Sequence, residues 1–167
     1  VHTLSPDLPN MRVVVGDNAH ATQRNIKRLF KTDPYLDTVN TTYIWSSTSP
    51  VRMLENSMFF KKIFNENIKN LQTHLAAVKA HPAVCSMAFA AVRYDSSQKL
   101  YGRSVLWFPA FLFTMMQIAQ CRSGSDEGRA ALQFLHFVDM ENALQFAMMA
   151  DAGDENFQLV RQFDDEG

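Results

Sequence analysis

Cysteine and glycine are scarce in this chain of 167 residues, which contains two cysteines and six glycines. Cys85 and Cys121 form no Cys-x-x-Cys pair, and both lie in apolar helical context. We therefore expect buried, reduced thiols, although a single disulfide between them stays open. The chain also lacks GxxxxGK[ST] and GxGxxG, the glycine loops that hold phosphates. Their absence argues against the common classes of nucleotide-binding protein.

Motifs for catalysis and metal binding are missing as well. The chain has no HExxH, no Glu-x-x-His pair and no GxSxG. His136 and Asp139 are expected one turn apart on a helix, but Glu141 points elsewhere. His81 and Cys85 are four residues apart, close enough for the imidazole to lower the thiol pKa, but no third group orients them. We therefore expect no catalytic residue, no metal site and no cofactor.

Charge is absent from the eighteen residues between Arg103 and Arg122. That length is about the minimum for a membrane-spanning helix, and it also suits a central helix that neighbours cover on every side. Thr114, Gln117 and Gln120 would place polar groups in lipid, and Pro109 interrupts the run. We therefore expect a buried core helix and no membrane span here, with interfacial and spanning helices as the alternatives.

The amino terminus shows neither the basic segment nor the apolar segment of a signal peptide, and it has no initiator Met. We therefore expect a domain excised from a longer protein, located in the cytoplasm or at the cytoplasmic face of a membrane complex. Phenylalanine (13) and methionine (9) are over-used. These residues fill a helical core, or they line an adaptable groove that binds a peptide.

The hydrophobic pattern predicts a mainly α fold, a single-domain helical bundle of about five to seven helices with at most a short N-terminal β-ribbon. Residues 1–17 are expected as an extended arm or short strand, 18–163 as the helical domain, and 164–167 as an acidic tail or cut linker. Ser49 should cap a helix that has Pro50 at its first position. Acidic residues after Ser125 suit another helix start.

Spacing and breaking residues place the individual elements. We expect helices over 18–31, from Pro50 to before Pro82 (as one helix or as two broken near 65–67), and over 84–93, 100–120, 130–149 and 157–163. Residues 35–49 should be irregular or extended, with a short strand over 42–45. Gly153 and Asp154 should interrupt the chain before the last short helix.

The two halves of the chain differ in charge. Residues 1–80 carry a net charge of +4 and residues 81–167 a net charge of −5. A basic helical face is expected in the first half, formed by Arg24, Lys27, Arg28 and Lys31. Aromatic side chains that could stack on bases or line a groove follow it, namely Tyr35, Tyr43 and Trp45.

We expect a non-enzymatic docking or scaffold domain that acts within a multi-protein assembly. Its protein partner would bring an acidic surface to the basic face and a helix or peptide to an apolar groove. The first alternative is a domain that binds RNA or single-stranded DNA through the same basic face. The second is a small helical enzyme or cofactor binder.

His81, Arg93, Leu106-Trp107, and His136 with Glu141 resemble residues of the cytoplasmic domain of DotM-like secretion coupling subunits. The spacings differ by several residues, and the Asp-Arg that follows that family's tryptophan region is missing. We therefore do not assign the chain to this family. The resemblance implies only that a secretion or conjugation coupling complex is a place to look for partners.

Replacing Arg24, Arg28 and Lys31 together by Glu is expected to weaken partner binding, because the reversed face would repel an acidic partner. The melting temperature should change little, since these side chains are expected to be solvated. Titration at several salt concentrations separates the two binding functions. Affinity for nucleic acid falls steeply with ionic strength, whereas docking in an apolar groove persists. Unchanged affinity for every ligand after the charge reversal would remove the basic face from the function.

Overall fold

The computed structural model describes residues 2–3, 12–13, 28–74, 87 and 94–165. Two short strands pair antiparallel, with His2 opposite Val13 and Thr3 opposite Arg12. The other described residues are mostly helical, which confirms the expected mainly α fold. The elements are β1 (His2–Thr3), β2 (Arg12–Val13), α2 (Pro34–Asn40), η1 (Thr41–Trp45), α3 (Pro50–Asn56), α4 (Met58–His74), α5 (Tyr94–Leu106), α6 (Phe108–Cys121), α7 (Asp126–Phe137) and α8 (Met140–Asp165).

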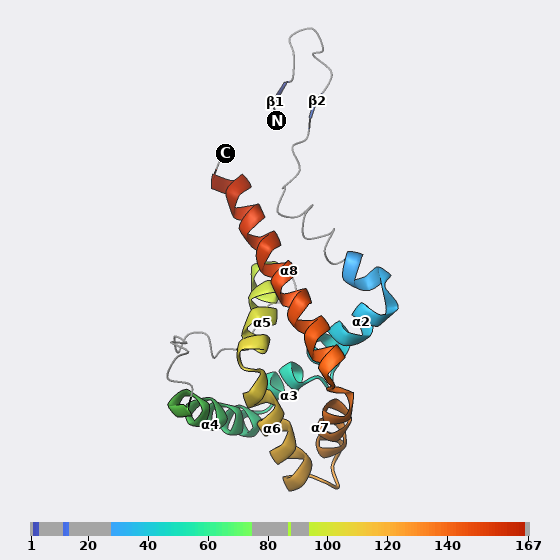
Figure 1. Cartoon of the computed structure of the whole chain (residues 1–167), viewed down its shortest axis with the longest axis vertical. Coiled ribbons are helices and arrows are strands. Elements are labelled where there is room, and N and C mark those ends of the chain that lie inside the picture. The colour runs from blue at the N-terminus through green and yellow to red at the C-terminus, as the bar shows by residue number, and fades with distance from the viewer. Residues whose placement is uncertain (1, 4–11, 14–27, 75–86, 88–93, 166–167) are drawn as a thin grey trace.

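The helices form two connected groups (Figure 1). The long helix α8 runs beside α5, and α2 packs near the start of α8. Helices α6 and α7 form an antiparallel pair, α4 crosses α6, and α3 contacts α4, α7 and the π-helix η1. The core lies where these two groups meet, so side chains from both halves of the chain contribute to it.

Capping residues explain where three helices begin. Asp33 accepts hydrogen bonds from the backbone N–H groups of Tyr35 and Leu36 at the start of α2, and a proline follows it. Ser49 accepts from the N–H of Arg52 at the start of α3, again with proline at the first helical position. Ser125 caps α7 in the same way. The expected helix starts at Ser49 and Ser125 are therefore confirmed.

The strand expected over residues 42–45 is wrong. Helix α2 continues without a break into the π-helix η1, whose last turn is closed by the N–H of Ser46 donating to the carbonyl of Thr41 at 2.7 Å. The β-branched and aromatic residues of this segment favour a strand by propensity alone. Burial of Tyr43 and Ile44 against the other helices outweighs that preference.

The single helix expected over residues 100–120 is also wrong, because α5 and α6 meet at an angle of 75°. Trp107 lies at the bend and is buried. Pro109 then falls in the first turn of α6, where its missing N–H costs no helical hydrogen bond. The expected burial of this segment is confirmed for one face of α6, which buries Ala110, Phe111, Thr114, Met115 and Ile118.

Two other helix breaks lie elsewhere than expected. The helix from Pro50, expected to be continuous or broken near 65–67, breaks at Ser57. The helix expected over 130–149 breaks at Val138 and Asp139, where the Asp139 carboxylate accepts from the N–H of Asn142 at 2.7 Å and starts α8.

No break occurs at Gly153 and Asp154, since α8 continues to Asp165. It absorbs the separate helix expected over 157–163 and the first two residues of the expected tail. Most of the helix expected over 18–31, and all of that expected over 84–93, lie outside the described residues.

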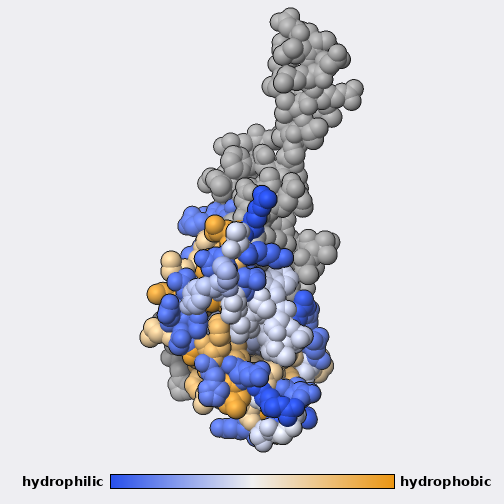
Figure 2. Space-filling model, turned by 90° about the vertical axis from the view of Figure 1, so that its right-hand side faces the viewer, coloured by the Kyte–Doolittle hydropathy of each residue, from blue (hydrophilic) through white to orange (hydrophobic). Residues whose placement is uncertain are grey.

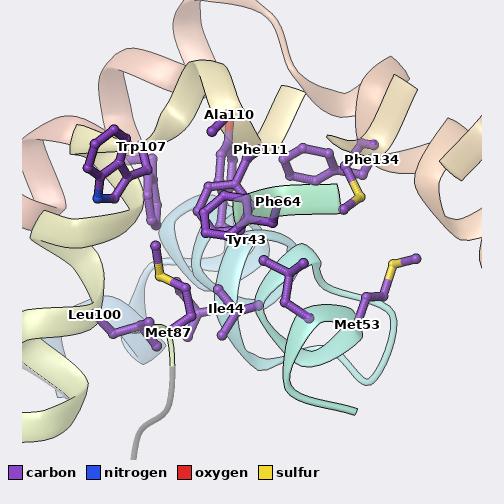
Figure 3. Close-up of a cluster of buried hydrophobic side chains, with 14 of the residues drawn as sticks. Tyr43, Ile44, Met53, Phe64, Met87, Leu100, Trp107, Ala110, Phe111 and Phe134 are labelled. Atoms are coloured by element: carbon purple, nitrogen blue, oxygen red, sulfur yellow. The ribbon is translucent and has the colours of Figure 1, made fainter. Parts of the chain in front are cut away.

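The centre of the core is the ring of Tyr43, which is 4% exposed. It stacks on Phe146 of α8 with ring centroids 4.2 Å apart and an interplanar angle of 11°. Phe134 and Phe137 of α7 meet it edge-on at 5.3 and 6.1 Å, and Phe108 of α6 stacks at 5.9 Å. We call these five residues the Tyr43 cluster. Figure 3 shows Tyr43 and Phe134 among the other buried side chains.

Polar side chains connect helices inside the core. The amide of Asn67 in α4 donates to Thr114 Oγ1 at 3.0 Å and to Gln117 Oε1 at 3.1 Å, both in α6. The hydroxyl of Tyr101 in α5 donates to Asn40 Oδ1 at the end of α2. Such buried hydrogen bonds fix which helices face each other, because a wrong pairing would leave polar groups unsatisfied.

No single helix among the described residues has both the length and the apolar character needed to cross a membrane. The bent pair of residues 100–106 and 108–121 meets these criteria only when its two arms are taken together.

Replacing Phe146 by Ala should lower the free energy of unfolding by about 3–5 kcal/mol, because it removes the ring stacked on Tyr43 and leaves a cavity. Leu144→Ala, two residues away on the exposed side of α8, is the matched control and should cost less than about 1 kcal/mol. Urea unfolding followed by circular dichroism measures both. Equal losses would mean that Phe146 does not occupy the core.

Burial raises the pKa of Tyr101 to about 12, although the hydrogen bond that Trp45 Nε1–H donates to its hydroxyl lowers it. A raised folded-state pKa means that the folded chain holds this proton more tightly than the unfolded chain does. The resulting stability is complete below about pH 10 and is lost as the pH rises towards 12. Between about pH 9 and 11.5, the free energy of unfolding of the unmodified chain should therefore fall by about 2 kcal/mol more than that of the Tyr101→Phe variant. Parallel pH-dependent urea titrations test this, and identical slopes would contradict it.

Candidate docking surface on helix α8

Helix α8 has two distinct faces. One face is buried and carries Asn142, Phe146, Met149, Ala150, Gly153 and Asn156. At about 100° per residue, the opposite face carries Met140, Leu144 and Met148, followed by Asp151 and Glu155. All five of these outward-facing residues are exposed.

We call Met140, Leu144 and Met148 the α8 stripe. Their exposed fractions are 85%, 58% and 55%, so no described element covers them. They are spaced at i, i+4 and i+8, which aligns them along one side of the helix over about 12 Å. Single exposed hydrophobic residues are ordinary on protein surfaces, whereas an aligned set makes this face of α8 a candidate contact surface.

The stripe is held outward by contacts on the buried side of α8. The hydroxyl of Tyr35 in α2 donates to Asn142 Oδ1 at 2.8 Å, and Asn142 Nδ2 donates to the carbonyl of Phe137 at 2.8 Å. Helix α5 also packs closely on α8, because a Cβ added to Gly102 of α5 would already lie 3.4 Å from a carboxylate oxygen of Asp154. The helix therefore cannot turn about its axis without breaking these contacts.

The surroundings of the stripe are acidic. Residues 140–156 contain four acidic residues and no basic one. All four, Glu141, Asp151, Asp154 and Glu155, are exposed. Partial burial first, and then the carboxylates of Asp151 and Glu155, raise the pKa of Asp154. The carboxylates of Asp151 and Glu155 therefore add to the effect of burial and disfavour the charged form of Asp154.

A second group of exposed hydrophobic side chains lies on α4 and α6. Phe59, Phe113 and Met116 are each about half exposed. The guanidinium of Arg122 lies 5.7 Å from the centre of the Phe59 ring and covers part of it. Exposed Gln117 and Gln120 share the outer face of α6. This group is therefore more polar than the α8 stripe.

Hydrophobic side chains also appear among hydrophilic ones on the side of the molecule drawn in Figure 2, mostly in its lower half. Other large hydrophobic residues are exposed at scattered positions of the described chain, namely Leu29, Tyr35, Met58, Leu106 and Leu132. Scattered residues of this kind are normal for a folded domain and define no site.

A shallow cleft of about 280 Å³ lies between η1 and α7. Phe134 and Phe137 line it together with hydroxyl-bearing residues and one amide, namely Thr41, Thr42, Ser46, Thr48 and Gln133. Among the described residues, its lining includes no charged side chain. The hydroxyls of Ser46 and Thr48 hydrogen-bond to each other at 2.8 Å, so part of its polar capacity is already used within the chain.

Of the four residues expected to bind a partner or phosphate, the structure describes two. Arg24 and Lys27 lie outside the described residues. Arg28 and Lys31 are exposed on the helical segment 28–32.

The expected stacking set of Tyr35, Tyr43 and Trp45 does not form one surface. Tyr43 is buried in the core, and Trp45 is half-buried with its Nε1 donating to the Tyr101 hydroxyl at 3.4 Å. Tyr35 is 40% exposed. Burial, Glu141 and Asp139 raise its pKa, so it sits beside the acidic start of α8.

The other residues weighed for chemistry are scattered. His136, Asp139 and Glu141 are all exposed, and the described residues contain no group of three His, Cys, Asp or Glu side chains placed to hold a metal ion. Cys121 was expected to be buried, but it is exposed at the end of α6. His81 and Cys85 lie outside the described residues.

The hydrophobic pattern of the sequence did not reveal the α8 stripe, because residues 140–156 are apolar on both sides of the helix. Phe146, Met149 and Ala150 alternate with Leu144 and Met148, so the hydrophobic pattern does not show which set faces inward. The signal in the sequence that one side of this helix is exposed was its four acidic residues, which no basic residue accompanies. A helix buried on every side would not carry them.

Comparison of the chain with protein-family models, with curated proteins and with solved structures finds no match in any of the three.

Proposed function

We propose that this chain is a protein-docking domain of a multi-protein assembly, with the α8 stripe as its docking surface. The observation that carries this proposal is the alignment of Met140, Leu144 and Met148 on the exposed side of a helix whose other side is fixed in the core. The side chains of this surface suit binding to another protein. It offers apolar side chains and carboxylates but no paired acid and base.

The size of the stripe suits a helix-binding surface. Fully burying an exposed Leu or Met side chain contributes about 1.5–3 kcal/mol. The three side chains of the stripe are 55–85% exposed, so covering each one supplies a part of that free energy. Interfaces usually depend on a few central residues of this kind. Methionine adapts its shape to different partners, which favours its use at two of the three positions.

Nucleic-acid binding has less support. The buried ring of Tyr43 is not available to stack on a base. Arg28 and Lys31 are exposed, but basic residues on one helix are most often only its solvated face. The acidic residues of α8 would repel phosphates. Contact of the basic segment with a second, acidic partner remains compatible with docking at α8.

A photo-reactive amino acid at position 144 should crosslink this chain to a defined protein in native lysate. The same amino acid at position 116 on α6 is the matched control, because Leu144 and Met116 have similar exposure. The crosslink from position 144 should disappear when Met140 and Met148 are both replaced by Gln. The melting temperature of that variant should change by only a few degrees, because both side chains point outward.

Nuclease treatment should leave the crosslinked protein unchanged. Identical crosslinked products from positions 144 and 116, or products that persist after the methionine replacements, would contradict docking at the α8 stripe. Products that vanish with nuclease would favour the nucleic-acid alternative.

A further inference from the structure

We infer that the occupant of the α8 stripe is an amphipathic helix that carries Lys or Arg beside its apolar face. This inference rests on the proposed function and specifies the partner chemistry. It is carried by the shape of the stripe together with the charges around it.

The shape of the stripe fits one helix. Its three side chains form a single row along α8, spaced by four residues, and such a row packs into the groove between rows of another helix. An extended strand would need exposed backbone for hydrogen bonding, whereas the backbone of α8 is bonded within the helix. Residues 141–155 span about 21 Å, so the matching partner helix has about four turns.

The charges around the stripe select the sign of the partner. Glu141 lies beside the start of the stripe, and Asp151 and Glu155 extend the same outward face beyond its end. The two ends are therefore both acidic. A partner with basic side chains at both ends of its apolar face would pair with these carboxylates as the apolar rows meet.

Charge also disfavours three other occupants. Two copies of α8 would bring two acidic helices together, in either the parallel or the antiparallel orientation. A nucleic acid would meet carboxylates instead of cations. An anionic lipid surface attracts helices whose polar face is basic, and residues 140–156 contain no basic residue.

Two designed helical peptides of about 18 residues, long enough for about five turns, test the inference. Both carry Leu at i, i+4 and i+8, and the flanking positions are Lys in one and Glu in the other. Binding to the full chain is followed by fluorescence anisotropy. The Lys peptide should bind about tenfold more tightly than the Glu peptide, as expected for three exposed ion pairs. The difference should shrink as salt is added.

Two variants locate the effect. Met140→Gln, Leu144→Gln and Met148→Gln together should abolish binding of both peptides. Glu141→Gln, Asp151→Asn and Glu155→Gln together should remove most of the preference for the Lys peptide. Glu66→Gln, Asp126→Asn and Glu127→Gln form the control, because these exposed residues lie on α4 and α7 and their replacement changes the net charge equally. This control should keep the preference.

The outcomes separate the inference from the function on which it rests. Equal affinity for the two peptides, lost when the stripe is replaced, would overturn the basic partner but leave docking at α8 standing. Failure of both peptides to bind would overturn the helical partner, while crosslinking from position 144 decides the docking function independently. Binding of the Lys peptide that survives replacement of the stripe would place the cation site elsewhere and overturn the inference.

Discussion

The stacking of Tyr43 on Phe146 is the contact on which the rest of the structure depends. Tyr43 comes from the π-helix η1, Phe146 from α8, and the rings around them from α6 and α7. One aromatic cluster thus joins segments that are about a hundred residues apart in sequence. Aromatic pairs contribute about 0.5–1.5 kcal/mol beyond their buried area, so several meeting at one ring form a strong centre.

The position of Phe146 also decides what α8 presents to solvent. Because a helix turns by about 100° per residue, fixing Phe146 inward directs Leu144 and Met148 away from the core. The hydrogen bonds of Asn142 fix the same rotation one turn earlier. The exposed stripe is therefore a geometric consequence of the core, and η1 shapes the outer surface of α8 although it lies on the other side of the helix.

Local signals predict where helices begin, but not where they bend or which side faces inward. Ser49 and Ser125 are recognisable because a capping side chain acts within one turn. The bends at Ser57, Trp107 and Val138 depend on packing between distant segments, so glycine and proline alone mark them poorly. Gly153 looks like a break in sequence, yet it is buried and lies inside α8. The burial of Tyr43 could not be predicted either, since its partners lie on three other helices.

An exposed row of Met and Leu side chains favours unwanted association unless something opposes it. The carboxylates beside the row supply that opposition, because two copies of the same acidic helix repel each other whichever way they approach. The same carboxylates cost nothing against a cationic partner and instead attract it. In the proposed docking function, a single charge pattern would therefore disfavour self-association and still admit a basic helix. An apolar row flanked by mixed charges would lack this selectivity, which is why the absence of any basic residue from 140–156 matters more than the number of acidic ones.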